Sequence, residues 1–187
     1  MRRRIITILL GTLIIFVWNA VSWTVLPFHS NSLNNIPKSA IDADKLQKVL
    51  PSDGVYHYPG LPDGNEVKDL ADLEKKLNTG PRITLMVFKK GATNLFDPKT
   101  LGLNLLFNFL TVVITFFIVY NNKNKTLKNI VVTTSLIGLT IGLVSDLPQM
   151  NWYLFPLEYT LVNVFDHIIA LVLIGFLFGL YTFKKEY

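Results

Sequence analysis

The side chains most able to do chemistry lie in the last apolar stretch of the chain, from Leu157 to Phe183. Asp166 and His167 are neighbours there, and Asn163 precedes them by three and four positions. In a helix with about 100° per residue, these three side chains share one face. A carboxylate beside an imidazole among apolar residues could pass a proton or hold a polar ligand between helices.

The position of Asp166 places this polar face deep inside the apolar stretch. It comes nine positions after Leu157, which corresponds to about 14 Å along a helix, whereas the hydrocarbon core of a bilayer is about 30 Å thick. A charge at that depth is costly unless it is paired, hydrated or neutralised. We therefore expect Asp166 to face protein or water and not lipid.

A second apolar stretch, Leu101 to Tyr120, carries polar residues that could meet this face. Asn104 and Asn108 are four positions apart and project from one side of a helix. One interpretation is that they hydrogen-bond to the Asp166 face and hold the helices together. The other is that all of these residues form a proton relay or a ligand site.

Asp146 is a further candidate for the intramembrane polar site. Together with Asn151 and Glu158, it gathers polar and acidic groups where the third and fourth apolar stretches meet. The group could be a cation entry point. An acid such as Glu158 at a helix N-terminus is also explained by a favourable interaction with the helix dipole.

Two pairs of glycines predict close helix packing. Gly138 and Gly142 lie in GLTIG, and Gly175 and Gly179 lie in GFLFG. Small residues four apart let the backbone of a neighbouring helix approach closely. These faces could join helices within the chain, join copies into a homo-oligomer, or join the chain to another membrane-protein subunit.

The composition indicates a membrane protein. Half of the 187 residues are hydrophobic (50%) and the mean hydropathy is +0.39, which is too apolar for an ordinary soluble domain. The net charge of +5 is explained by basic residues at the ends of apolar stretches, so it predicts no nucleic-acid partner. The absence of cysteine excludes disulfides, thiolate metal sites and cysteine nucleophiles.

Four apolar segments predict a membrane all-α fold, a four-transmembrane-helix bundle. They run over Ile5–Leu26, Leu101–Tyr120, Ile130–Val144 and Leu157–Phe183. The first covers 22 residues, longer than the apolar core of a cleavable signal peptide, which has about 7 to 15 residues. We interpret it as an uncleaved anchor.

The stretch between the first two spans predicts a small α/β domain, marginal alone and resting on the membrane or on another copy. AIDADKLQKVL and EVKDLADLEKKLN have the apolar spacing of helices, the second ending at Gly80-Pro81, and GVYHY and RITLMVF are typical of strands. The predicted domains are an anchor at 1–28, an extracytoplasmic α/β domain at 29–100 and a three-helix transmembrane region at 101–187.

Basic residues predict the orientation of the chain. If the N-terminus is cytoplasmic, every inner segment is basic and the short outer turn between the last two spans holds no lysine or arginine, as the positive-inside rule expects. The inner basic residues are Arg2, Arg3, Arg4, Lys123, Lys125, Lys128, Lys184 and Lys185. Both termini are then cytoplasmic and residues 29–100 lie outside.

Four short motifs carry a resemblance. WTVLPFH (23–29), GVYHYPG (54–60), GPRITLMV (80–87) and NWYLFP (151–156) resemble landmarks of a group of uncharacterised small bacterial four-span inner-membrane proteins. The resemblance implies a bacterial inner (cytoplasmic) membrane and the four-span layout. It implies no ligand, cofactor or catalytic residue.

Motifs of known chemistry are missing from the sequence. GLPDG lacks the Lys-Ser/Thr of a phosphate loop, and neither G-x-S-x-G nor H-E-x-x-H occurs. His29 and His57, with Asp53 or Asp63, match no metal-ligand spacing. A bis-histidine haem would need His29 to approach His167. We therefore expect no metal, no cofactor and no enzymatic activity.

Two functions remain open on this basis. The first is a non-enzymatic accessory or assembly subunit of a membrane complex, held through the glycine faces and the outer domain. The alternative is a small carrier or proton-linked transport component that uses the polar face of the last helix.

Overall fold

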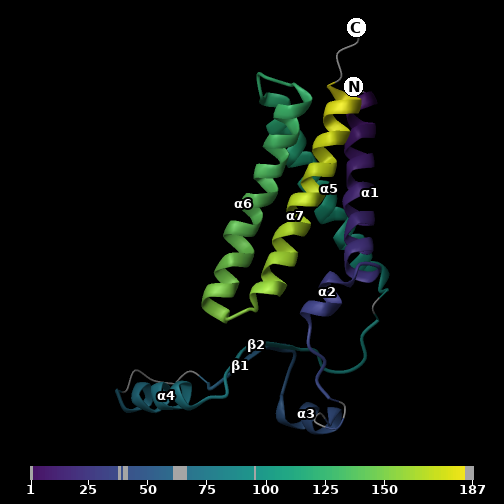
Figure 1. The fold of residues 1–187 in the computed structure, drawn as a ribbon. Coiled ribbons are helices and arrows are strands. Elements are labelled where there is room, and N and C mark those ends of the chain that lie inside the picture. The colour runs from purple at the N-terminus through teal and green to yellow at the C-terminus, as the bar shows by residue number, and fades with distance from the viewer. Residues whose placement is uncertain (1, 38, 40–41, 61–66, 95, 184–187) are drawn as a thin grey trace. The chain divides into compact units, whose positions relative to one another are not determined.

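The computed structural model describes residues 2–37, 39, 42–60, 67–94 and 96–183 (Figure 1). The chain forms two compact units. The larger unit comprises Met1–Asn34 and Leu95–Tyr187, and the smaller comprises Asn35–Asn94.

Four long apolar helices make up most of the larger unit. They are α1 (Arg2–Thr24), α5 (Pro98–Asn121), α6 (Leu127–Tyr153) and α7 (Leu157–Leu177), and each is long and apolar enough to cross a membrane. Each of the four predicted apolar segments is therefore confirmed as a long helix. Helix α7 continues into a π-helical turn, η1 (Phe178–Thr182).

Helix α6 is longer than its apolar segment predicts. It continues past Val144 through Asp146 and Pro148, and ends where Leu154 adopts a left-handed conformation with φ 58°. Proline removes one backbone donor from a helix, a loss that packing against a neighbouring helix can offset. Asp146 therefore lies on a helix and not in a connecting loop, which corrects the sequence-based boundary.

Side-chain caps fix where two of these helices begin. Asp97 accepts a hydrogen bond from the Thr100 backbone N–H at 2.9 Å, and Pro98 occupies the first position of α5. Thr126 accepts from the Asn129 N–H at 3.4 Å at the start of α6. Such caps satisfy backbone donors that have no partner inside the helix.

All four predicted packing glycines lie where α6 meets α7 and η1. A Cβ on Gly138 would stand 2.6 Å from the backbone oxygen of His167, and one on Gly142 would stand 2.9 Å from the Val164 side chain. Gly175 faces Val131 and Thr134, and Gly179 faces Leu127. The small-residue faces are therefore used within the chain.

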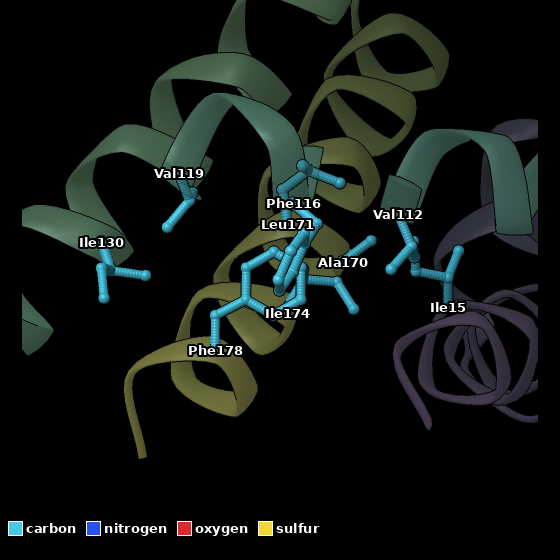
Figure 2. Packing of buried hydrophobic residues seen from close by; sticks show 9 residues of the cluster. All are labelled: Ile15, Val112, Phe116, Val119, Ile130, Ala170, Leu171, Ile174 and Phe178. Atoms are coloured by element: carbon cyan, nitrogen blue, oxygen red, sulfur yellow. The ribbon is translucent and has the colours of Figure 1, made fainter. Parts of the chain in front are cut away.

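The hydrophobic core of this unit gathers residues from α1, α5, α6, α7 and η1 (Figure 2). Phe116 meets Phe178 edge to face, with ring centroids 5.4 Å apart. The buried cluster consists of Ile15, Val112, Phe116, Val119, Ile130, Ala170, Leu171, Ile174 and Phe178.

The smaller unit has the predicted order of helices and strands. The helices are α3 (Ala43–Val49) and α4 (Val67–Thr79), and the strands are β1 (Gly54–Tyr58) and β2 (Ile83–Phe88). The strands pair antiparallel, with a register shift between Tyr56 and Tyr58. Gly80, at φ 61°, follows the end of α4 as the sequence predicts.

Asp53 ties the two strands together at one end of the sheet. Its carboxylate accepts a hydrogen bond from the Lys90 backbone N–H at 2.7 Å and pairs with the Lys89 ammonium. The hydrogen bond from Lys89, and after it that from Lys90, holds the pKa of Asp53 below its usual value.

Replacing Gly138 by alanine is expected to destabilise the helix pair. The added Cβ meets backbone of α7, so the helices must separate, at a cost of about 1–3 kcal/mol. Gly102→Ala is the control, because a Cβ there meets nothing within 4 Å. Thermal unfolding in detergent should show a lower midpoint for Gly138→Ala alone; equal midpoints would contradict the packing.

Acidification is expected to loosen the β1–β2 pair through Asp53. Its pKa is lowered in the folded state, so the stabilisation is fully present above the usual value of 3.8 and is lost as the pH falls through the lowered value. Amide hydrogen exchange of the two strands should be slower in wild type than in Asp53→Asn at pH 7. This difference between the two proteins should disappear toward pH 2. Equal protection in both proteins at pH 7 would contradict this role.

Candidate functional site

A short helix, α2 (Pro27–Ser32), follows the end of α1 and packs against α1 and α7 (Figure 1). It places His29 in the interior, where the side chain is only 1% exposed. The sequence-based prediction lacks this helix, although Pro27 at its first position is a helix-start signal. The interior position of His29 therefore comes from a turn of the chain that the apolar pattern does not reveal.

Asp166 is held by residues from two other helices. The Ser22 hydroxyl of α1 lies 2.7 and 2.8 Å from the two carboxylate oxygens and donates to them. The His29 ring of α2 lies 2.7 Å from Oδ2 through its Nε2. The Asp166 side chain is 14% exposed, so a carboxylate among apolar helices has two close hydrogen-bond partners.

The contacts of His29 favour one tautomer. Because an ionised carboxylate only accepts hydrogen bonds, the Nε2–H group is the donor of the hydrogen bond to Asp166. Nδ1 is buried and has no partner among the described residues. A proton there would be a buried donor without an acceptor, which favours a neutral ring protonated at Nε2. Trp23 covers the ring by stacking on it at 3.8 Å.

A second carboxylate–histidine pair adjoins the first. His167 Nε2 lies 3.2 Å from Asp146 Oδ2 of α6. The distance fits an ion pair, but Asp146 Oδ2 makes no aligned hydrogen bond among the described residues, so this contact is looser than that of His29. Because Asp166 and His167 are consecutive, α7 carries one member of each pair.

A half-open cavity of about 760 Å³ lies between the long helices, and its mainly apolar lining carries several polar side chains. Its wall includes polar side chains of α1, α5 and α7: Asn19, Thr24, Asn104, Asn108, Thr111, Asn163, Asp166 and His167. Aromatic and aliphatic side chains, among them Phe16, Trp23 and Leu171, complete it. Five of the six predicted polar-site residues therefore line one cavity, and the sixth, Asp146, is paired with His167.

The core positions this polar layer. On α1, Asn19 follows the core residue Ile15 by four positions. In the same way Asn108 lies four positions from Val112, and Asp166 lies four positions from Ala170. Residues four apart share a helix face. The helix faces that pack the core therefore also turn the polar side chains toward one another.

The asparagines do not play the part predicted for them. Instead of Asn104 and Asn108, the partners of the α7 face are Ser22, His29 and Asp146. Asn108 is 7% exposed and its Nδ2 has no partner in the described chain. The reason is that α5 packs mainly against α1, and the cavity lies between its asparagines and α7.

Asn163 also differs from the prediction. Its Nδ2 donates to the Tyr159 carbonyl of its own helix at 2.8 Å. It lines the cavity without bonding to Asp166 or His167 through this group.

A second hollow, of about 340 Å³, lies along α1 and reaches Leu173 of α7. It is lined by aliphatic side chains and Trp18. Such a surface suits hydrocarbon and offers no group that could do chemistry.

The histidines do not gather into a metal centre within the described residues, where no group of three or more His, Asp or Glu side chains could hold an ion. His29 and His167, which a bis-histidine haem would require, pair with different carboxylates. His57 is an exposed strand residue whose Nδ1 lies 3.1 Å from the Pro59 carbonyl. Asp63 lies outside the described residues.

No protein-family model, curated protein or solved structure matches the chain. The site therefore has to be interpreted from the chemistry of its own residues.

Removing His29 is expected to destabilise the protein strongly. His29→Ala leaves the Asp166 carboxylate with Ser22 alone, and losing a hydrogen bond to a charged group costs about 1.5–3 kcal/mol. Asn31→Ala, an exposed position on the same short helix, is the matched control. Unfolding in detergent, measured as a double-mutant cycle with Asp166→Ala, should show that the two losses are not additive. Additive losses would mean that the two side chains do not interact.

Proposed function

We propose that the chain is a multi-pass protein of the bacterial inner membrane, with both termini cytoplasmic and the predicted extracytoplasmic region 29–100 outside, except for its ends, α2 with His29 and the start of α5, which belong to the larger unit. The length and hydropathy of the four helices support this topology. Further support comes from Arg4 and Lys125, which lie over the Tyr120 ring at 4.5 and 5.6 Å. Basic and aromatic side chains gathered at one end of a bundle are typical of a cytoplasmic interface. Lys184 and Lys185 lie outside the described residues.

The opposite end of the bundle also supports this orientation. The turn between α6 and α7 is flanked by Trp152 and Tyr153, which are 71% and 43% exposed, and it contains no lysine or arginine. Amphipathic rings prefer the membrane–water interface. This end therefore fits the outer surface of the membrane.

The function that the geometry supports best is that of a proton-linked membrane transport component. One observation carries the proposal: Asp166 and His167, consecutive on α7, each pair with a titratable partner on another helix, and both line one cavity. The ionised Asp166 carboxylate, which accepts a hydrogen bond from the neutral His29 ring at 2.7 Å, is the group that can take up a proton delivered through this cavity. Side chains that only fastened helices together would need no cavity beside them.

Each pair has a different part in this proposal. His167 is 37% exposed and pairs loosely with Asp146, so it can exchange protons with water in the cavity. Asp166 and His29 form the tighter pair, in which the Asp166 carboxylate takes up and releases the proton while His29 keeps its own proton on Nε2. The asparagines of the cavity provide amides that orient water or a small polar solute between the two pairs.

The accessory-subunit function has less support from the geometry. In the sequence its main evidence is the two glycine pairs, and these glycines face α6, α7 and η1 of the same chain. We keep the non-enzymatic character of the protein as part of the proposal, since Ser22 donates to Asp166 and not to His29, an order that differs from the Ser-His-Asp chain of a catalytic triad.

Replacing Asp166 by asparagine is expected to abolish proton movement. In liposomes that contain a pH-sensitive dye, wild-type protein under an imposed membrane potential should acidify or alkalise the lumen faster than protein-free lipid. Asp166→Asn keeps the shape of the side chain but cannot exchange a proton, so its rate should fall at least tenfold. Glu158→Gln, at an exposed acid of the same helix, is the control and should keep the wild-type rate.

Two results would contradict the proposal. One is a wild-type rate equal to that of protein-free liposomes. The other is an Asp166→Asn rate equal to that of wild type, with both proteins folded by circular dichroism.

A further inference from the structure

One face of the two-stranded sheet in the smaller unit is aliphatic and open. Val55 of β1 and Val87 of β2 are direct cross-strand partners, and they are 61% and 81% exposed. Ile83, Leu85 and Val87 occupy every second position of β2, so their side chains point to the same side of the sheet. Ile83 is 44% exposed and Leu85 is 37% exposed. We call these four side chains the aliphatic sheet face.

The other face of the sheet is better covered. Tyr56 and Phe88 pack edge to face with ring centroids 6.3 Å apart, and Met86, the cross-strand partner of Tyr56, is half-buried. The exposure therefore belongs to one side of the sheet and not to the strands as a whole.

The buried hydrophobic cluster contributes nothing to the described part of the smaller unit, so the aliphatic sheet face is left without a core to pack on. Every residue of the buried cluster lies in the larger unit. A two-stranded sheet without a covered hydrophobic face is marginally stable in water. The aliphatic sheet face therefore requires a cover that the described residues of the smaller unit do not supply.

The attachment of the smaller unit limits what that cover can be. The unit begins at Asn35, three positions after α2 ends at Ser32, and it ends at Asn94, four positions before α5 begins at Pro98. An extended chain covers at most about 3.6 Å per residue, so each end stays within roughly 15 Å of a helix of the larger unit. If those helices cross a membrane, the hydrocarbon region of that membrane is the nearest large apolar medium.

The charges beside the aliphatic sheet face fit a lipid surface. Arg82 precedes β2, and Lys89 and Lys90 follow it, all with exposed side chains. By the alternation along β2, Lys89 falls on the side of Val87 and pairs with Asp53. Arg82 and Lys90 begin on the side of Met86, at opposite ends of the strand, and reach the rim of the aliphatic sheet face through their long side chains. Tyr58, opposite Ile83 and 51% exposed, adds an amphipathic ring. Cations and tyrosine around an apolar patch are suited to the headgroup region.

We propose that the aliphatic sheet face docks onto the lipid bilayer in which the same chain is anchored. This inference rests on the proposed membrane topology. The side chains of Val55, Ile83, Leu85 and Val87 enter the boundary between headgroups and acyl chains, and Arg82 and Lys90 meet lipid phosphates. The smaller unit thus lies flat on the outer surface and uses lipid in place of a core of its own.

Single-cysteine labelling tests the inference, because the chain has no cysteine of its own. Full-length Val87→Cys and Val55→Cys carry an environment-sensitive fluorophore in liposomes of phosphatidylethanolamine and phosphatidylglycerol. Lys75→Cys, at an exposed position on α4, is the aqueous control. Phe107→Cys, at a 59% exposed site on α5, is the lipid control.

The docked face predicts a specific pattern of quenching. Iodide in the buffer should quench the probes at positions 87 and 55 at least threefold less than the probe at position 75. A nitroxide attached near the lipid headgroup should quench them at least threefold more. The probe at position 107 should respond only to nitroxides placed along the acyl chain.

Three outcomes would overturn the inference. Iodide quenching at position 87 equal to that at position 75 would mean an open face. Shielding from iodide without quenching by lipid nitroxide would mean that protein, such as a second copy of the chain, covers the face. Iodide quenching at position 107 would show that α5 does not lie in the membrane. It would contradict the proposed topology and therefore the docking that depends on it.

Discussion

The need of one buried carboxylate for partners organises the larger unit. Asp166 stands on an apolar helix, and an ion in such surroundings is costly unless its oxygens are satisfied. Ser22 of α1 and His29 of α2 supply the donors. One side chain therefore fixes where α1 ends against α7, and it holds the short helix that leads into the smaller unit against the bundle.

The core and the polar layer share the same helix faces, and this links stability to function. Ile15, Val112 and Ala170 pack in the core, and the residues four positions away on each helix line the cavity. Helices α6 and α7 pack tightly against each other, whereas α5 packs mainly against α1. This difference leaves room for the cavity. A bundle packed evenly on all sides would bury the same polar groups without access for a proton or a solute.

Most of the long elements could be predicted from the sequence because they depend on local patterns. Apolar runs predicted the four long helices, and Gly138 and Gly142 predicted a close helix contact. Asn104, Asn108, Asn163, Asp166 and His167 of the cavity were also found, since a charge or amide inside an apolar run is conspicuous. Asn19, an amide in the first apolar run, was missed although it carries the same signal. Helix α6 was predicted too short because Pro148 is a local stop signal, and packing along α7 overrides it.

The partners of Asp166 could not be predicted in the same way. Ser22 and His29 are 144 and 137 positions away in the chain, and neither belongs to a pattern that points to α7. The contact depends on how α1 ends and how α2 turns back, which are tertiary features. The Asn104 and Asn108 contacts predicted instead assumed that α5 lies directly against α7, whereas the cavity intervenes.

The most direct test of this account is the nitrogen NMR spectrum of His29 in lipid, readable because the chain contains only three histidines. The account predicts a ring protonated at Nε2 and bare at Nδ1, with an Nε2 resonance that shifts in Asp166→Asn while that of His57 stays unchanged. A His29 spectrum that is insensitive to Asp166→Asn would show that the two side chains do not meet, and would contradict the account.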